Sequence, residues 1–146
     1  MAGINYGRVV LGGLAAGVVA NVCDVFISVY LMADDLQRMT RRLNLDWEVV
    51  NGPAVLVTWA IVDFLYATLI VWTYAAIRPR FGPGPKTAVV AGLVPYAATT
   101  IVLSGFQSMG IFTLDSFVKN AALSLVTAVL AGLVGGAIYK ENAPTA

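Results

Sequence analysis

Two aspartates inside long apolar stretches are the residues of this chain most able to do chemistry. Asp24 stands ten residues before Asp34, and Asp63 stands ten residues after Pro53. If both stretches are antiparallel membrane-spanning helices, a rise of about 1.5 Å per residue puts both carboxyls about 15 Å from the same membrane face. The spacing therefore predicts that the two side chains meet near the membrane middle, where carboxyl groups can exchange protons or hold a cation.

Further polar side chains fall in the same layer by helical counting: Asn21, Thr99, Thr100 and Thr127. One hypothesis makes this layer a proton or cation site. The alternative makes both aspartates neutral, hydrogen-bonded to the asparagine or to threonine hydroxyls, and important only for helix register. Under either hypothesis we expect at least one aspartate to be protonated at neutral pH, because two close charges are disfavoured in an apolar medium.

Other kinds of site are disfavoured by what the chain lacks. It contains no histidine, which removes Ser-His-Asp and Cys-His catalysis, imidazole-bound zinc and histidine-ligated haem. Its single cysteine, Cys23, cannot form an intrachain disulfide. A formal net charge of +1, without a run of lysine and arginine, gives no basis for nucleic-acid binding. We therefore expect no metal, no cofactor and no enzymatic activity.

Composition predicts the elements that position these residues. Of the 146 residues, 59% are hydrophobic and 12% are charged, whereas a soluble domain is nearer half apolar and a quarter charged. Four apolar blocks are each long enough to cross a hydrocarbon core of about 30 Å. The sequence predicts an all-α fold, with a single transmembrane domain built as a four-helix bundle and spans at about 9–33, 53–77, 87–109 and 117–139.

The segment between the first two spans is predicted to form an interfacial amphipathic helix over about residues 34–47. Its apolar residues recur at helical spacing, opposite three arginines. The apolar stripe would rest at the acyl boundary while the arginines reach lipid headgroups. The apolar residues are Leu36, Met39, Leu43 and the aromatic anchor Trp47, and the arginines are Arg38, Arg41 and Arg42. One hypothesis is that this helix docks onto lipid or onto a partner protein, and the alternative is an ordinary amphipathic connector that keeps the loop at the membrane surface.

The connector from Arg78 to Lys86 is predicted to be a stiff, non-helical turn, because it contains three prolines and two glycines. Its basic residues would lie at the level of the headgroup phosphates: Arg78, Arg80 and Lys86. With four spans, the face of the termini carries these three with Arg8 and Lys140, and the other face carries Arg38, Arg41, Arg42 and Lys119. Five against four favours cytoplasmic termini.

Small residues spaced four apart line two of the spans and predict close helix packing. Gly13 and Gly17 lie on the first span, and Ala128, Gly132 and Gly136 lie on the fourth. Small side chains let helix backbones approach each other, either within one bundle or between protomers.

Three stretches of the chain resemble a family of small, uncharacterised bacterial membrane proteins. They are NYGRVVLGGLAAGVV from Asn5 to Val19, WTYAAIRPRFGPGPKTA from Trp72 to Ala88, and AIYKE from Ala137 to Glu141. The resemblance covers the ends and the central loop, and it implies a four-span protein of the bacterial inner membrane. It implies no chemistry and carries no site residue over.

Two functions of different classes fit these observations. The first is a non-catalytic membrane protein, such as an accessory subunit of a larger complex, which is favoured by the missing catalytic groups, the stiff loop and the small-residue faces. The second is a small proton-coupled transporter that acts as a homo-oligomer through Asp24 and Asp63. An enzyme that uses the aspartate pair is the least favoured. The expected partners are the lipid bilayer and either a second copy or other membrane subunits.

Overall fold

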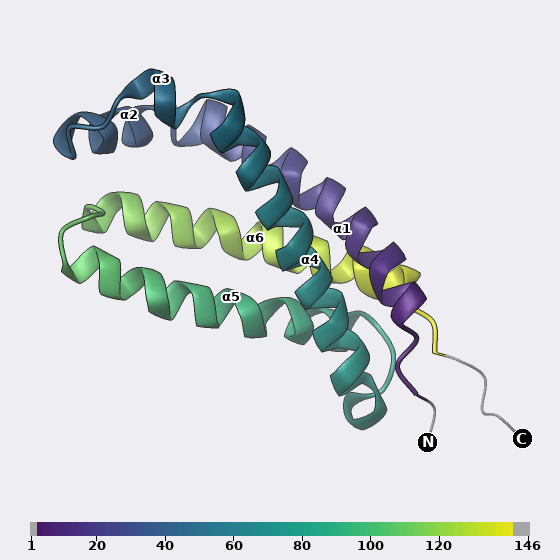
Figure 1. Cartoon of the computed structure of the whole chain (residues 1–146). Helices are drawn as coiled ribbons and strands as arrows, with labels where there is room; N and C mark the ends of the chain where they lie inside the picture. The colour runs from purple at the N-terminus through teal and green to yellow at the C-terminus, as the bar shows by residue number, and fades with distance from the viewer. Residues whose placement is uncertain (1–2, 142–146) are drawn as a thin grey trace, which may run out of the picture.

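The computed structural model describes residues 3–141, and these are almost entirely helical (Figure 1). The long helices are α1 (Tyr6–Phe26), α4 (Pro53–Phe81), α5 (Pro85–Ser108) and α6 (Leu114–Ile138). A π-helical turn, η1 (Ile27–Leu31), continues α1, and the short helices α2 (Ala33–Arg42) and α3 (Trp47–Val50) lead into α4. Four helical segments are long and apolar enough to cross a membrane, which confirms the predicted four-span bundle.

Each long helix begins where its first backbone N–H groups are satisfied or absent. Asn5 and Thr113 cap α1 and α6, because each side chain accepts a hydrogen bond from the N–H three residues further on. The helices α4 and α5 begin with Pro53 and Pro85, which have no N–H to satisfy.

The predicted non-helical turn over Arg78–Lys86 is wrong in its extent. The helix α4 continues through Pro79 to Phe81, and only residues 82–84 lie between α4 and α5. The fixed φ of proline is compatible with a helix, and the hydrogen bond that it removes here belongs to the last turns of α4. Gly82 and Gly84 make the turn with φ values of 80° and 130°, a region that disfavours other residues.

The interfacial helix predicted over residues 34–47 is also shorter than expected. The helix α2 ends at Arg42, because Asn44 adopts a left-handed φ of 52° and the Leu45 N–H donates to the Thr40 carbonyl at 2.9 Å. Asp46 then caps α3 by accepting a backbone hydrogen bond at 2.8 Å. The amphipathic segment is therefore two helices with a turn between them.

Glycines on α1 bring it against α4. A Cβ atom added to Gly13 would lie 2.9 Å from the Thr68 Cα, and one added to Gly17 would lie 2.8 Å from a ring carbon of Phe64. Real Cβ atoms do not approach other atoms so closely, so these contacts require glycine. Both glycines predicted for packing on the first span are thus at an intrachain contact.

The helices α5 and α6 approach each other in the same way. A Cβ atom added to Gly132 would lie 2.5 Å from the Ala88 carbonyl oxygen, and one added to Gly136 would lie 2.9 Å from the Ala88 Cβ. Ala128 contributes its backbone, because a Cβ added to Gly92 would lie 3.0 Å from the Ala128 carbonyl carbon. The small residues of the fourth span therefore also pack inside this chain.

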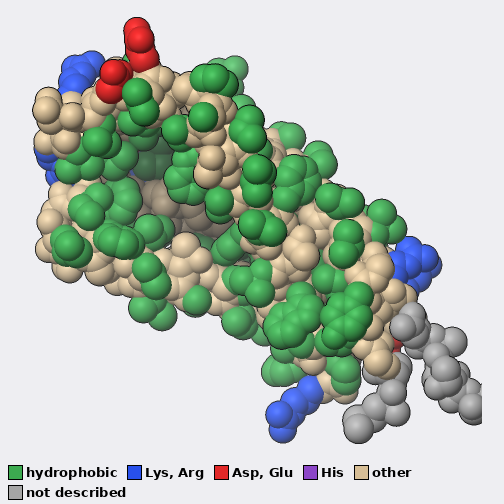
Figure 2. Space-filling model, in the orientation of Figure 1, with side chains coloured by type: hydrophobic (Ala, Val, Ile, Leu, Met, Phe, Trp, Pro, Cys, Tyr) green, Lys and Arg blue, Asp and Glu red, His purple; other side chains and the backbone are tan. Residues whose placement is uncertain are grey.

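The bundle is close-packed at one end and open at the other. We call the end that carries residues 3–5, the α4–α5 turn and Tyr139 the terminal face, and the end that carries α2, α3 and the α5–α6 turn the α2 face. Toward the α2 face, the α1–α4 pair diverges from the α5–α6 pair (Figure 1). The space-filling view shows a hollow between the two pairs on this half of the molecule (Figure 2).

The topology predicts which loops and termini lie on the same side of the membrane. Four spans return the chain to its starting side, so single cysteines replacing Lys86 and Lys140, both exposed, should react with an impermeant thiol reagent from one side. A cysteine replacing the exposed Glu48 should react only from the other side. The background is Cys23→Ala, which removes the native thiol. Labelling of the Lys86 and Glu48 positions from the same side would overturn the four-span arrangement.

Candidate functional site

The two aspartates lie on neighbouring antiparallel helices whose register is fixed by three contacts. Gly13 meets Thr68, Gly17 meets Phe64, and the Asn21 side chain reaches the Ala60 carbonyl on α4. This register does not put the two aspartates at the same level. Asp63 lies six positions further along α4 than the residue level with Asp24, which is an axial offset of about 9 Å.

The two carboxyls nevertheless reach each other. Side chains on a helix lean toward its N-terminus, so on antiparallel helices with this offset the side chains of Asp24 and Asp63 lean together. Their carboxyl groups lie close enough to interact directly. Both residues are half-buried. The structure thus brings the predicted pair together, through the lean of the side chains rather than through equal depth.

Asn21 does not contact the carboxyls by a hydrogen bond among the described residues. Its amide nitrogen donates to the Gly17 carbonyl at 2.9 Å and to the Ala60 carbonyl at 3.4 Å. Asn21 therefore links the backbones of α1 and α4 one turn from Asp24, and it supports the helix register on which the pair depends.

A tyrosine that the sequence analysis did not single out connects the pair to α5. Tyr66 lies one turn after Asp63 on α4, and its hydroxyl lies beside Thr99 of α5. The Thr99 hydroxyl itself donates to the Pro95 carbonyl at 3.0 Å. On α5, Tyr96 donates to the Ala121 carbonyl of α6 at 3.0 Å. The sequence signal that could have identified Tyr66 is its position three residues after Asp63, which places the two side chains on the same side of a helix.

The other two threonines of the predicted layer differ from Thr99. Thr100 is half-buried, and no side-chain hydrogen bond from it is present within residues 3–141. Thr127 on α6 is 8% exposed, and its hydroxyl is buried without a hydrogen-bond partner in the described part of the chain. In the register set by Gly135 against Gly12, Thr127 is level with Ala20, about one turn from Asp24.

A charged cluster on the α2 face also escaped the sequence analysis. The Asp35 carboxylate, whose side chain is 2% exposed, accepts hydrogen bonds from Lys119 at 2.9 Å, Arg38 at 2.7 Å and Ser116 at 2.9 Å. The hydrogen bonds from Lys119 and then Arg38 lower the pKa of Asp35 to about 2. The cluster ties α2 to α6 across the open end of the bundle.

The remaining residues predicted to contact headgroups at this face have mixed surroundings. Arg41 is exposed and donates to Gln37 at 3.2 Å, and Trp47 is 40% exposed. Arg42 is exposed but donates to the Ile111 carbonyl in the α5–α6 turn. The arginines of α2 therefore donate hydrogen bonds to protein groups, from Arg38 to Asp35, from Arg41 to Gln37 and from Arg42 to the Ile111 carbonyl.

At the terminal face, one of the three predicted headgroup contacts faces the protein instead. The Arg78 side chain is 19% exposed, its guanidinium carbon lies 5.6 Å from the centroid of the Tyr139 ring, and its Nε lies 3.7 Å from the Glu141 carboxylate. Arg80 and Lys86 are exposed, and their contact with headgroups stays a prediction.

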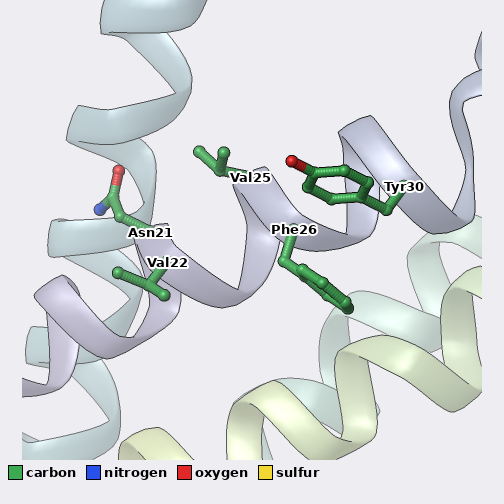
Figure 3. Close-up of a pocket in the computed structure, with 5 residues that line it drawn as sticks. All are labelled: Asn21, Val22, Val25, Phe26 and Tyr30. Atoms are coloured by element: carbon green, nitrogen blue, oxygen red, sulfur yellow. The ribbon is translucent and has the colours of Figure 1, made fainter.

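A surface depression of about 380 Å³ on α1 offers no polar chemistry. Asn21, Val22, Val25, Phe26 and Tyr30 line it, all from α1 and η1 (Figure 3). Val22, Val25 and Tyr30 are each more than 60% exposed, so this depression lies on the outer face of α1 that the membrane lipids cover.

Within residues 3–141, no group of three histidine, cysteine, aspartate or glutamate residues is placed to hold a metal ion. Comparison with protein-family models, with curated proteins and with solved structures finds no match to this chain.

Proposed function

We propose that this chain is a small proton-coupled carrier of the bacterial inner membrane that works through the Asp24–Asp63 pair. The observation that supports this function is the meeting of two carboxyls from antiparallel spans inside the membrane-spanning part of the bundle. Ionisable groups at this depth are costly to insert and mark ion or proton pathways in membrane proteins.

The chemistry of the pair links proton release to cation binding. With one proton present, one carboxyl donates to the other, and the pair carries a single negative charge. Loss of that proton leaves two negative charges facing each other in an apolar medium. A cation that enters as the proton leaves removes this repulsion, so the pair is suited to exchange one for the other.

The packing of the helices weakens the case for an accessory subunit. That function drew support from small-residue faces that are free to bind another protein. Gly13 and Gly17 pack on α4, and the small residues of α6 pack on α5, so these faces are occupied within the chain. A carrier of this size acts as a homo-oligomer, because four helices leave little room for a transport path, and both termini lie in the cytoplasm.

Substitution of either aspartate tests the proposal. Asp24→Asn and Asp63→Asn mimic the protonated carboxyl, so both variants should fold in detergent as stably as the wild type. In liposomes, both should lose proton flux driven by a pH gradient or by cation addition. Asp34→Asn, at an exposed position on α2, is the matched control and should keep wild-type flux.

Two outcomes would overturn the carrier function. One is proton flux that is unchanged in both asparagine variants. The other is a wild-type protein that shows no flux and copurifies with other membrane proteins in fixed ratio, which would favour the accessory subunit instead.

A further inference from the structure

Four polar residues form a continuous stripe along the apolar helix α6. Ser116, Asn120, Ser124 and Thr127 follow each other at intervals of four, four and three residues, which places them on one side of the helix. The first three are half-buried and Thr127 is buried. Sequence reasoning had singled out only Thr127 of these four.

Contacts at both ends show which way the stripe faces. At the α2 face, Ser116 donates to Asp35 at 2.9 Å. At the inner end, Gly135 lies two turns beyond Thr127 on the same side, and it packs against Gly12 on α1. The stripe therefore faces α1, across the region where the two helix pairs diverge around the hollow (Figures 1 and 2).

The side chains of this stripe are not satisfied in the way that is usual in membrane helices. Hydroxyls on α4 and α5 donate to carbonyls three or four positions earlier at 2.7–3.0 Å: Thr58, Thr68, Thr73, Thr99, Ser104 and Ser108. Within the described residues, the side chains of Asn120, Ser124 and Thr127 make no such bond, and the Thr127 hydroxyl is buried without a partner. Polar groups inside a membrane need a partner, and water is the one that fits a hydroxyl and an amide equally.

We infer that this stripe is a hydrated track that carries protons from the α2 face to the Asp24–Asp63 pair. In the register of Gly12 against Gly135, Ser124 is level with Cys23, next to Asp24. Beyond Thr127 the same side of α6 continues with Ala131 and Gly135, which are buried in the close-packed half. Access is therefore one-sided, and Asp35 and Lys119 stand at its entrance. This inference rests on the proposed function of the pair.

Thiol reactivity tests the track. Single cysteines replacing Asn120 and Ser124, in a Cys23→Ala background in liposomes, should react with a charged, impermeant thiosulfonate added on the α2 side. The matched control replaces Val126, which is 56% exposed and lies on the lipid-facing side at nearly the same depth. A thiol that reacts as thiolate needs water, so we expect the Ser124 position to react about tenfold faster or more than the Val126 position.

Equal rates at the Ser124 and Val126 positions, or reaction from the terminal side, would overturn the track. A second pair of variants, Ser124→Leu and Val126→Leu, keeps the test independent of cysteine. Only Ser124→Leu should slow proton flux, with both proteins folded as judged by their thermal melts. If the cysteine that replaces Ser124 reacts as expected while Asp24→Asn retains full flux, the track stands and the carrier function fails. If Asp24→Asn abolishes flux while the cysteine that replaces Ser124 is unreactive, the carrier function stands and the track fails.

Discussion

Replacing Gly92 by alanine should destabilise the protein by about 2–3 kcal/mol, because the added methyl group meets backbone rather than a movable side chain. A Cβ at this position would fall against the Ala128 carbonyl oxygen and 3.0 Å from its carbonyl carbon. The α5 and α6 backbones must separate to admit it, which also disturbs Gly132 against Ala88. The measurement is the midpoint of unfolding of the detergent-solubilised protein by heat or by a denaturing detergent.

The same helix offers a matched control with the opposite sign. A Cβ added to Gly105, also on α5, would meet nothing within 4 Å. Alanine favours a helix over glycine by up to about 1 kcal/mol, so Gly105→Ala should be neutral or stabilising. If Gly92→Ala and Gly105→Ala shift the midpoint equally, the close approach of α5 and α6 is not what holds this half of the bundle together.

Removing the Asp35 carboxylate should release α2 from α6 and lower the free energy of unfolding by about 2 kcal/mol. The carboxylate is 2% exposed and has three donors, but Arg38 and Lys119 are 68% and 45% exposed, so both can return to water after Asp35→Ala and the cost stays well below that of a fully buried pair. Asp34→Ala is the neighbouring control. Its side chain is exposed, and its loss should change stability by less than about 0.5 kcal/mol.

The same carboxylate predicts a pH dependence with a definite sign. The pKa of Asp35 is about 2 in the folded protein, against 3.8 for the free side chain. A lowered pKa in the folded state stabilises the protein above pH 3.8, and this stabilisation is lost as the pH falls toward 2. Because the donors are partly in water, we expect about 1–2 kcal/mol to be lost over this window. Asp35→Asn should remove this part of the acid sensitivity, and an unchanged acid transition in that variant would contradict the assignment.

The features that the sequence predicted are those set by local composition. Long apolar blocks predicted the four helices, and the spacing of Asp24 from Asp34 and of Asp63 from Pro53 led to the prediction that the two aspartates meet. The estimate of equal depth was in error, because the contacts of Gly13 and Gly17 with α4 set a register that offsets the two aspartates, and their side chains meet by leaning toward each other. Counting residues along a single helix cannot give its register against another helix.

The features that it missed depend on contacts between distant segments. Asp35 and Lys119 are far apart in sequence, and nothing local marks either as a partner of the other. Tyr66 looks like an ordinary apolar residue until Thr99 is placed beside it. The π-helical turn η1 has no composition signal, since Ile27–Leu31 is as apolar as the helix before it. Pro79 led to the prediction of a helix break between the second and third spans. The structure instead places Pro79 in the last turns of α4, a position that the sequence does not reveal.

The divergence of the two helix pairs also sets the outline that the protein presents to lipids. At the terminal face, glycine and alanine draw the four helices together, so the protein occupies a small area of that leaflet. At the α2 face the same helices spread around the hollow and occupy a larger area (Figures 1 and 2). The protein therefore tapers along the membrane normal, and any widening or narrowing of the hollow changes the area it occupies in one leaflet more than in the other.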